Sequence, residues 1–163
     1  MRQVFFSFEY KKDNWRASTI RNIGKVSKDS TFSDNDWEEV KYKSKENIEK
    51  WIKEQMKMRS CIIVLIGSTT YSRPWVRFEI EEAYRQKKGI VGIYINKLKD
   101  KNGNASSKGP NPFYYVKNDK GERLSNYVTV FNSIYETSKY VYEDISNNIE
   151  YLIEEAIKNA GTY

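Results

Sequence analysis

The sequence predicts a single α/β domain in which helices cover both faces of a parallel sheet. Two uninterrupted apolar runs, residues 61–66 and 90–95, have the length of strands and lack alternation. Such runs are typical of strands that are buried on both faces. Helical patterns separate the strand-like runs, and this alternation is the order expected of parallel strands joined by crossover helices.

The first half of the chain supplies a strand and two helices. The aromatic run 4–8 predicts a buried strand, and residues 14–23 predict a helix that Gly24 ends. The polar stretch 25–42 is longer than most loops, and loops of that length are usually functional. Ser44 is expected to cap the next helix, whose apolar stripe contains Ile48, Trp51, Ile52 and Met56. In the helix 14–23, the expected apolar members are Trp15, Ile20 and Ile23.

The second half completes the alternating order. Gly67 ends the strand 61–66, Ser72 is placed to cap the following helix, and Pro74 falls in its first turn. Residues 127–131 alternate in polarity and predict an edge strand. The clearest amphipathic helix comes last, with apolar positions at Ile145, Ile149, Leu152, Ile153, Ala156 and Ile157.

The composition excludes several kinds of chemistry. The chain has no histidine and one cysteine, Cys61. It therefore cannot hold a Ser-His or Cys-His nucleophile pair, a histidine metal site, an internal disulfide or a zinc cluster. It also lacks the glycine-rich phosphate-binding fingerprints. We expect no metal site and no cofactor, and activity that does not depend on a divalent metal.

The charge and apolar patterns bear on partners and location. The net charge is +6, which suits nucleic acid, anionic lipid or a phosphate-bearing ligand. Many lysines are interleaved with glutamates, however, as on a solvated helix face, and we expect neither nucleic acid nor a membrane as partner. The apolar runs are too short to span a bilayer, and the amino terminus does not resemble a signal peptide. These features predict a cytoplasmic protein.

Residues 66–80 hold the best candidate site. They follow a buried strand and open a helix, at the edge of the sheet where α/β proteins bind ligands. Trp75 and Glu79 are one helical turn apart, and an aromatic wall beside a carboxylate suits a sugar-bearing ligand. The helix dipole is expected to keep Glu79 ionised, and Glu82 is expected to be a surface acid. The alternative is that Trp75 only packs and Glu79 is a solvated first-turn acid.

The spacing Ser68-x-x-Tyr71 followed by Trp75-x-x-x-Glu79 resembles the signature of Toll/interleukin-1 receptor (TIR) domains, a flavodoxin-like fold. The gap between Tyr71 and Trp75 is one residue shorter than usual, and Val76 replaces the common cysteine. The fuller resemblance is to the TIR-like component of the bacterial Thoeris anti-phage system. It covers about residues 3–113 and is carried by residues 4–8, 21–22, 64–68, 75–80, 95–96 and 108–113. The single domain 1–163 would then consist of this core and a tail, 114–163, with the edge strand and the last helix.

The resemblance implies an enzyme that cleaves NAD+ and releases a cyclic or otherwise modified ADP-ribose as a messenger. It implies Glu79 as the catalytic residue and NAD+ as substrate, with the pocket formed by Phe6, Ser7, Phe8, Asp36, Trp37, Ser68, Tyr71 and Trp75. It further implies self-association through TIR contacts, a separate Thoeris effector that senses the messenger, and a phage component as a possible trigger. Arg16, Arg21 and Arg77 are alternative partners for the pyrophosphate.

The residue inventory agrees with this chemistry. Glycosidic cleavage passes through a cationic, oxocarbenium-like transition state, which one carboxylate can stabilise without histidine or metal. Two other classes of protein are alternatives to this enzyme. A non-enzymatic TIR-type adaptor has the same fold but no need of Glu79. A flavodoxin-like receiver would need acidic residues at positions held here by Ser7, Gly67 and Ser68.

Overall fold

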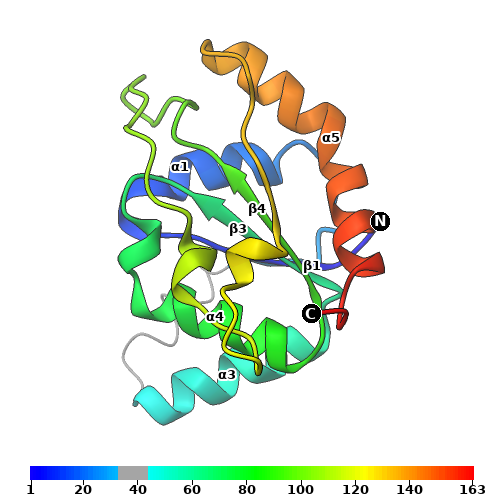
Figure 1. The fold of residues 1–163 in the computed structure, drawn as a ribbon. Coiled ribbons are helices and arrows are strands. Elements are labelled where there is room, and N and C mark those ends of the chain that lie inside the picture. The colour runs from blue at the N-terminus through cyan, green and yellow to red at the C-terminus, as the bar shows by residue number, and fades with distance from the viewer. Residues whose placement is uncertain (33–43) are drawn as a thin grey trace.

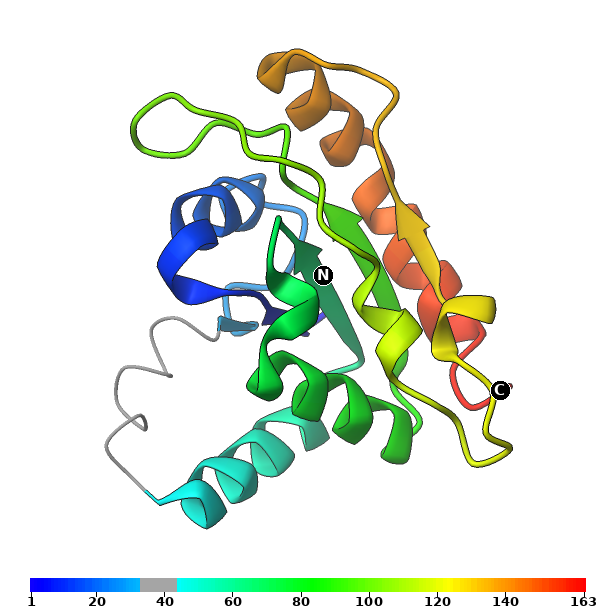
Figure 2. The ribbon, with the colours of Figure 1, turned by 60° about the vertical axis from the view of Figure 1, so that its left-hand side comes forward.

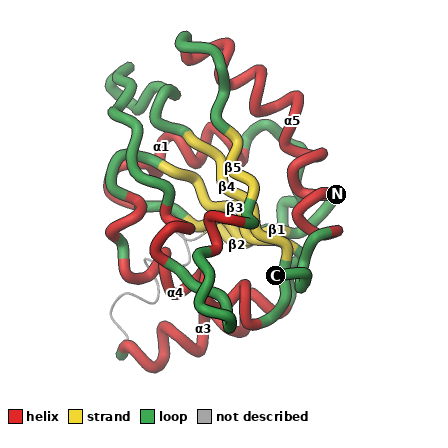
Figure 3. Tube along the Cα trace, in the orientation of Figure 1, coloured by secondary structure: helices red, strands yellow, loops and turns green. Residues whose placement is uncertain are grey.

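A computed structural model of the chain describes residues 1–32 and 44–163. Its centre is a parallel sheet of five strands in the order β2-β1-β3-β4-β5 (Figure 3). The strands are β1 (Val4–Ser7), β2 (Thr31–Phe32), β3 (Cys61–Ile66), β4 (Gly89–Tyr94) and β5 (Thr129–Phe131). The predicted α/β fold with a parallel sheet is confirmed. The strand order changes direction between β1 and β3, and ligand sites of such sheets lie outside the carboxyl ends of the strands at this point.

Two layers of helices enclose the sheet (Figures 1 and 2). The helices α1 (Tyr10–Arg21) and α5 (Ser138–Lys158) cover one face, and α3 (Lys45–Lys57) and α4 (Pro74–Arg85) cover the other. Short 3₁₀ turns η1 (Thr70–Ser72), η2 (Pro112–Tyr115) and η3 (Leu124–Asn126) lie in the connections. Within the described ranges, no helix has both the length and the apolar character needed to cross a membrane.

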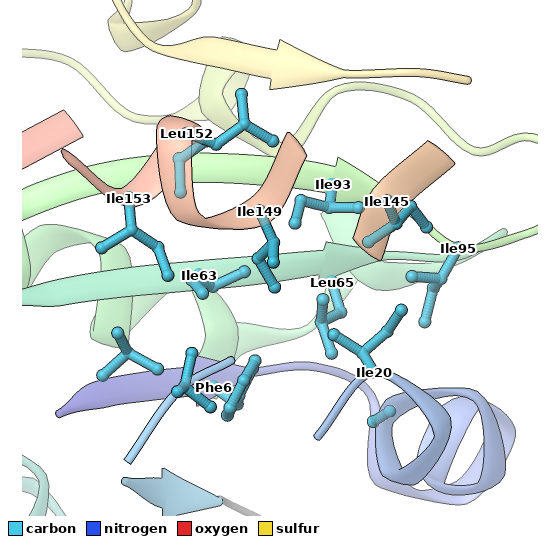
Figure 4. Packing of buried hydrophobic residues seen from close by; sticks show 14 of the residues in the cluster. Phe6, Ile20, Ile63, Leu65, Ile93, Ile95, Ile145, Ile149, Leu152 and Ile153 are labelled. Carbon is cyan, nitrogen blue, oxygen red and sulfur yellow. The ribbon is translucent and has the colours of Figure 1, made fainter. Parts of the chain in front are cut away.

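Alternate residues of the central strands enter two separate cores. In β1, Val4 and Phe6 face α1 and α5, whereas Phe5 faces α3 and α4. Figure 4 shows the first core, in which Ile63 and Leu65 of β3 meet apolar side chains of α1 and α5. All six residues of β3 are completely buried, which explains its unbroken apolar sequence. Each such side chain contributes roughly 1.5–3 kcal/mol through its burial.

The segment after β4 is anchored to the same strand. A Cβ atom at Gly92 would lie 2.8 Å from the ring of Phe113, so only glycine lets this ring pack directly on β4. Phe113 is fully buried, and the side chain of Asn111 accepts a hydrogen bond from its backbone N–H at 2.9 Å. Phe113 therefore fixes η2 over the sheet, close to η1.

The local predictions differ from the structure mainly in the first helix. This helix begins at Tyr10, four residues earlier than predicted, and Trp15 is 54% exposed instead of packing in the core. Asp13 and Arg16 are buried in its place, because they pair with each other. The prediction that Ser72 caps α4 was also wrong, because the N-cap residue of this helix is Arg73. The Ser72 hydroxyl instead donates a hydrogen bond to the Thr69 carbonyl. The cap of α3 by Ser44 and the edge strand at β5 are confirmed.

Candidate active site

A buried polar pair joins β1 to α4 at the carboxyl end of the sheet. Ser7 is the last residue of β1, and its hydroxyl donates a hydrogen bond of 2.6 Å to Oε1 of Glu79 in α4. Ser7 is completely buried and Glu79 is 2% exposed. Glu79 is therefore not the solvated first-turn acid of the alternative interpretation. It is a carboxyl group held inside the protein by a specific donor.

Burial decides the protonation of this carboxyl group. Removal from water raises the pKa of Glu79 from 4.5 to about 8, and the hydrogen bond from Ser7 opposes that rise. The expectation that the helix dipole keeps Glu79 ionised is therefore wrong for the ligand-free protein. The desolvation of a buried carboxylate outweighs the modest stabilisation that a helix terminus offers.

A second carboxylate, Glu9, connects β1 to the turn after β3. Glu9 is 8% exposed, accepts a hydrogen bond from the Thr69 hydroxyl, and lies 3.9 Å from Nε of Arg73. Glu9 was not predicted as a residue of this edge. The available signal was its position directly after the first strand, where side chains reach the carboxyl edge of a parallel sheet.

A buried ion pair supports the same turn from the other face. Asp13 Oδ1 lies 2.8 Å from Nη1 of Arg16, and both side chains are at most 4% exposed. A Cβ atom at Gly67 would come within 2.1 Å of Asp13 Oδ2, so the carboxylate lies directly against the Gly67 backbone. Burial raises the pKa of Asp13, and the hydrogen bond from Arg16 counteracts this effect. Asp13 was also missed, because it lies just before the helix predicted at 14–23 and a charged side chain normally faces solvent.

The segment 108–113, which helps to carry the family resemblance, lies against this turn. A Cβ atom at Gly109 would lie 2.3 Å from the carbonyl oxygen of Gly67 and 2.5 Å from that of Ser68. Gly109 is buried, so its backbone packs directly against the backbone of Gly67 and Ser68, just after β3. Gly109, within a segment that carries the family resemblance, thus helps to shape the candidate site.

The predicted pocket residues do not all converge on Glu79. Ser7 does, but Phe6 and Phe8 belong to the core on the α1 and α5 side, where both rings pack on Phe32. Ser68 is half-buried on the turn after β3 and borders a cleft beside α1. Two further predicted residues, Asp36 and Trp37, lie outside the described part of the chain.

The two predicted wall residues occupy a neighbouring surface. The ring of Tyr71 packs on Tyr115 of η2, with centroids 5.6 Å apart. Trp75 packs edge-on against Phe78 and borders a pocket of about 270 Å³ between the amino ends of α3 and α4. Among the described residues, Glu49 and Glu81 supply the carboxylates of that pocket.

The three arginines considered for the pyrophosphate have different surroundings. Arg16 is buried, and its guanidinium is occupied by Asp13 and by backbone carbonyls. Arg21 lies over the ring of Phe32, 4.2 Å from its centroid. Arg77 is exposed, with its guanidinium 5.8 Å from the ring centre of Tyr115.

Glu82 differs from its predicted role as a surface acid. It is 3% exposed and accepts hydrogen bonds from Arg85 and from Gln86, the latter at 2.7 Å. The prediction was wrong because Arg85 at the end of the same helix and its C-cap residue Gln86 allow the carboxylate to be buried. Glu81, which is half-buried, is the better comparison for Glu79.

The arrangement provides one buried carboxyl group for chemistry at the carboxyl edge of the sheet. Glu9 and Asp13 are engaged by Thr69, Arg73 and Arg16, whereas Glu79 has one hydroxyl donor. In residues 1–32 and 44–163, no group of three or more histidine, cysteine or acidic side chains could hold a metal ion. A single carboxylate in low dielectric can stabilise a positive charge that develops on a substrate.

Comparison with known proteins identifies the family of this chain. Residues 5–100 match the family model described as "Thoeris protein ThsB, TIR-like domain". The chain is also 39% identical over 120 residues to a protein of Bacillus cereus (strain MSX-D12) named "Putative cyclic ADP-D-ribose synthase ThsB1". That match covers 71% of this chain and 62% of the relative, so the chain spans less than two thirds of the relative's length. The family match includes β1, α4 and the Ser7–Glu79 pair that joins them, and the chain belongs to the TIR-like domain family of the Thoeris protein ThsB.

Proposed function

We propose that this protein cleaves the bond between nicotinamide and ribose in NAD+ and forms a cyclic or otherwise modified ADP-ribose. The observation that carries the proposal is the buried Glu79 carboxyl group, which Ser7 holds at the carboxyl edge of the sheet. The name of the Bacillus cereus relative, a cyclic ADP-D-ribose synthase, supports the same reaction.

The reaction needs little more than charge stabilisation. When the C–N bond breaks, its electron pair leaves with nicotinamide, which becomes a neutral ring and requires no proton. The ribose carbon is left with cationic character, which the Glu79 carboxylate stabilises. A nucleophilic nitrogen or hydroxyl of the same ADP-ribose then attacks this carbon and loses a proton to close the ring. Attack by water instead gives linear ADP-ribose.

The substrate itself favours the active protonation state. The nicotinamide ring of NAD+ carries a positive charge, and an opposite charge nearby lowers the pKa of a carboxyl group. Binding of NAD+ therefore shifts Glu79 toward the carboxylate that the reaction needs. Because Glu79 is 2% exposed, the side chains that cover it must move aside when the substrate binds.

The family match supports a wider role, which is proposed here as well. We propose that the product is a messenger in anti-phage defence, that a separate Thoeris effector senses it, and that a phage component triggers its formation. Copies of the chain are proposed to associate, with NAD+ as substrate and without cofactor or metal. Addition of EDTA should therefore leave turnover unchanged.

The test is product analysis with three proteins. The parent, Glu79→Gln and Glu81→Gln are incubated with NAD+, alone and with phage lysate, and the products are identified by mass spectrometry. Glu79→Gln should reduce nicotinamide release by about a hundredfold or more, because it removes the charge but keeps the shape. Glu81→Gln removes the same charge two residues along α4 and should retain parental turnover. Circular dichroism verifies that all three proteins are folded.

Two outcomes would contradict the proposal. If Glu79→Gln cleaves NAD+ at the parental rate, Glu79 is not the catalytic residue. If the parent leaves NAD+ intact under both conditions, the enzymatic assignment fails and the non-enzymatic adaptor becomes the better interpretation.

A further inference from the structure

A basic cleft of about 510 Å³ lies between the first turns of α1 and the segment that follows β4. Figure 2 shows this segment passing beside α1, at the carboxyl end of the sheet. The cleft borders Ser68 on the turn after β3, so it opens at the point where the strand order changes direction. It lies on the α1 face of the sheet, whereas Glu79 lies on the α4 face.

Arg16 holds the two walls of the cleft together. Its Nε donates to the Leu98 carbonyl and its Nη2 to the Asn104 carbonyl, both at 2.7 Å. Asp100 in the second wall accepts hydrogen bonds from the backbone N–H groups of Asn102 and Asn104. The cleft is thus formed before any ligand arrives, which reduces the entropic cost of binding.

The charge that lines the cleft is largely uncompensated. Arg16 is neutralised by Asp13 and approached by Asp100, at 2.8 and 4.0 Å. Lys11 and Lys12 on α1 and Lys101 in the opposite wall make no ion pair with any residue that the structure describes. The positive end of the α1 dipole adds to their potential, because both α1 lysines lie in its first turn. Three cations on two facing walls suit a ligand with more than one negative charge.

The other residues that line the cleft indicate which class of ligand fits it. Trp15 is 54% exposed, borders the cleft and lies one helical turn after Lys11, so its ring is available beside the lysines. Hydroxyl and amide groups of Ser68, Asn102 and Ser106 complete the wall, and the Ser106 Oγ has no hydrogen-bond partner among the described residues. Phosphates need cations and polar donors, whereas a nucleobase needs an aromatic face.

We propose that this cleft binds a nucleoside diphosphate, with the phosphates between Lys11, Lys12 and Lys101 and the base on Trp15. Both NAD+, through its ADP half, and free ADP contain such a nucleoside diphosphate. Binding of NAD+ in the cleft rests on the proposed function, whereas binding of free ADP does not.

Binding is tested by titrating ADP and inorganic pyrophosphate into the parent protein in a calorimeter. The triple variant Lys11→Gln/Lys12→Gln/Lys101→Gln should lower the affinity for both ligands by at least about tenfold, because it removes charged donors. The matched control Lys57→Gln/Lys117→Gln/Lys158→Gln removes the same charge from exposed positions outside the cleft and should bind like the parent. Trp15→Ala should lower the affinity for ADP by about tenfold and leave the affinity for pyrophosphate unchanged. Equal ADP affinity in both triple variants overturns the proposal.

Steady-state kinetics with NAD+ then separates the two sources. If the cleft holds the ADP half of the substrate, the first triple variant raises KM at unchanged kcat and ADP competes with NAD+. If it holds free ADP, the KM is unaltered and ADP does not compete. Lysine-dependent ADP binding by a protein that does not cleave NAD+ supports the cleft and contradicts the proposed function. NAD+ cleavage without lysine-dependent ADP binding contradicts the cleft alone.

Discussion

Ser7 and Glu79 are 72 positions apart in the chain, yet the serine hydroxyl donates a 2.6 Å hydrogen bond to the glutamate, and both side chains are buried. The two effects on this carboxyl group oppose each other. Burial favours the neutral acid, whereas the hydrogen bond from Ser7 favours the carboxylate. We therefore expect Ser7 to position Glu79 and to tune the protonation of this proposed catalytic group, and this balance can be measured.

Ser7→Ala should move the pH dependence of NAD+ cleavage to higher pH. Loss of the hydrogen bond removes the interaction that lowers the pKa of Glu79, so that pKa rises above its value of about 8. The rising limb of kcat/KM against pH reports this ionisation in the free enzyme. Thr69→Ala removes a hydroxyl that donates to Glu9 and not to Glu79, so the midpoint of the rising limb should not change. An unchanged midpoint in Ser7→Ala would show that Ser7 does not control the reacting group.

Glu79→Gln should become more stable than the parent as the pH rises from 4.5 to about 8. In this window the unfolded chain has lost the Glu79 proton but the folded protein still holds it, so the parent's free energy of unfolding falls with pH. Above about pH 8 the folded protein also ionises and the difference levels off. The gap should reach on the order of a few kcal/mol, because one pKa unit corresponds to about 1.4 kcal/mol. Urea unfolding at several pH values measures it, and a pH-independent gap would contradict the buried acid.

Gly109→Ala should destabilise the protein by roughly 2 kcal/mol or more. Its new Cβ atom would lie 2.3 Å from the Gly67 carbonyl oxygen, and two buried backbone segments cannot separate without losing contacts. Gly103→Ala is the comparison: Gly103 has a φ of +80° but open space around it, so only backbone strain of about 1 kcal/mol is expected. Chemical denaturation of both variants is the measurement. Equal losses would mean that the close approach is not rigid.

Arg16→Met should cost about 3–5 kcal/mol, because it leaves the Asp13 carboxylate buried without its cation. The double variant Asp13→Asn/Arg16→Met removes both charges and should recover part of the loss. Breaking the exposed pair between Arg2 and Glu154 by Arg2→Met should change stability little, since solvent screens it. Thermal unfolding of the three variants provides the test. No recovery in the double variant would show that Arg16 acts through the carbonyls it binds and not through Asp13.

The local sequence pattern predicted the apolar helices and strands of this chain well. The strand β3, the cap of α3 at Ser44 and the apolar stripe of α5 were all predicted, because each depends on residues within a few positions. The parallel topology also followed from the order of these elements, since crossover connections leave few alternatives. Glu79 was identified as the residue of interest by its place after a strand and by its family spacing.

The sequence by itself determined the fold class, the apolar strands and helices, and the family, because these features depend on periodicity and on short motifs. Only the tertiary structure decided which polar side chains are buried: Glu79, Glu82 and Asp13 lie inside, while Trp15 lies at the surface. The physical reason is that burial of a charged group depends on its surroundings, and these are assembled by contacts that periodicity does not encode. Ser7 reaches Glu79 across 72 positions and Arg16 reaches Leu98 across 82, so neither partner could be assigned before the sheet brought them together.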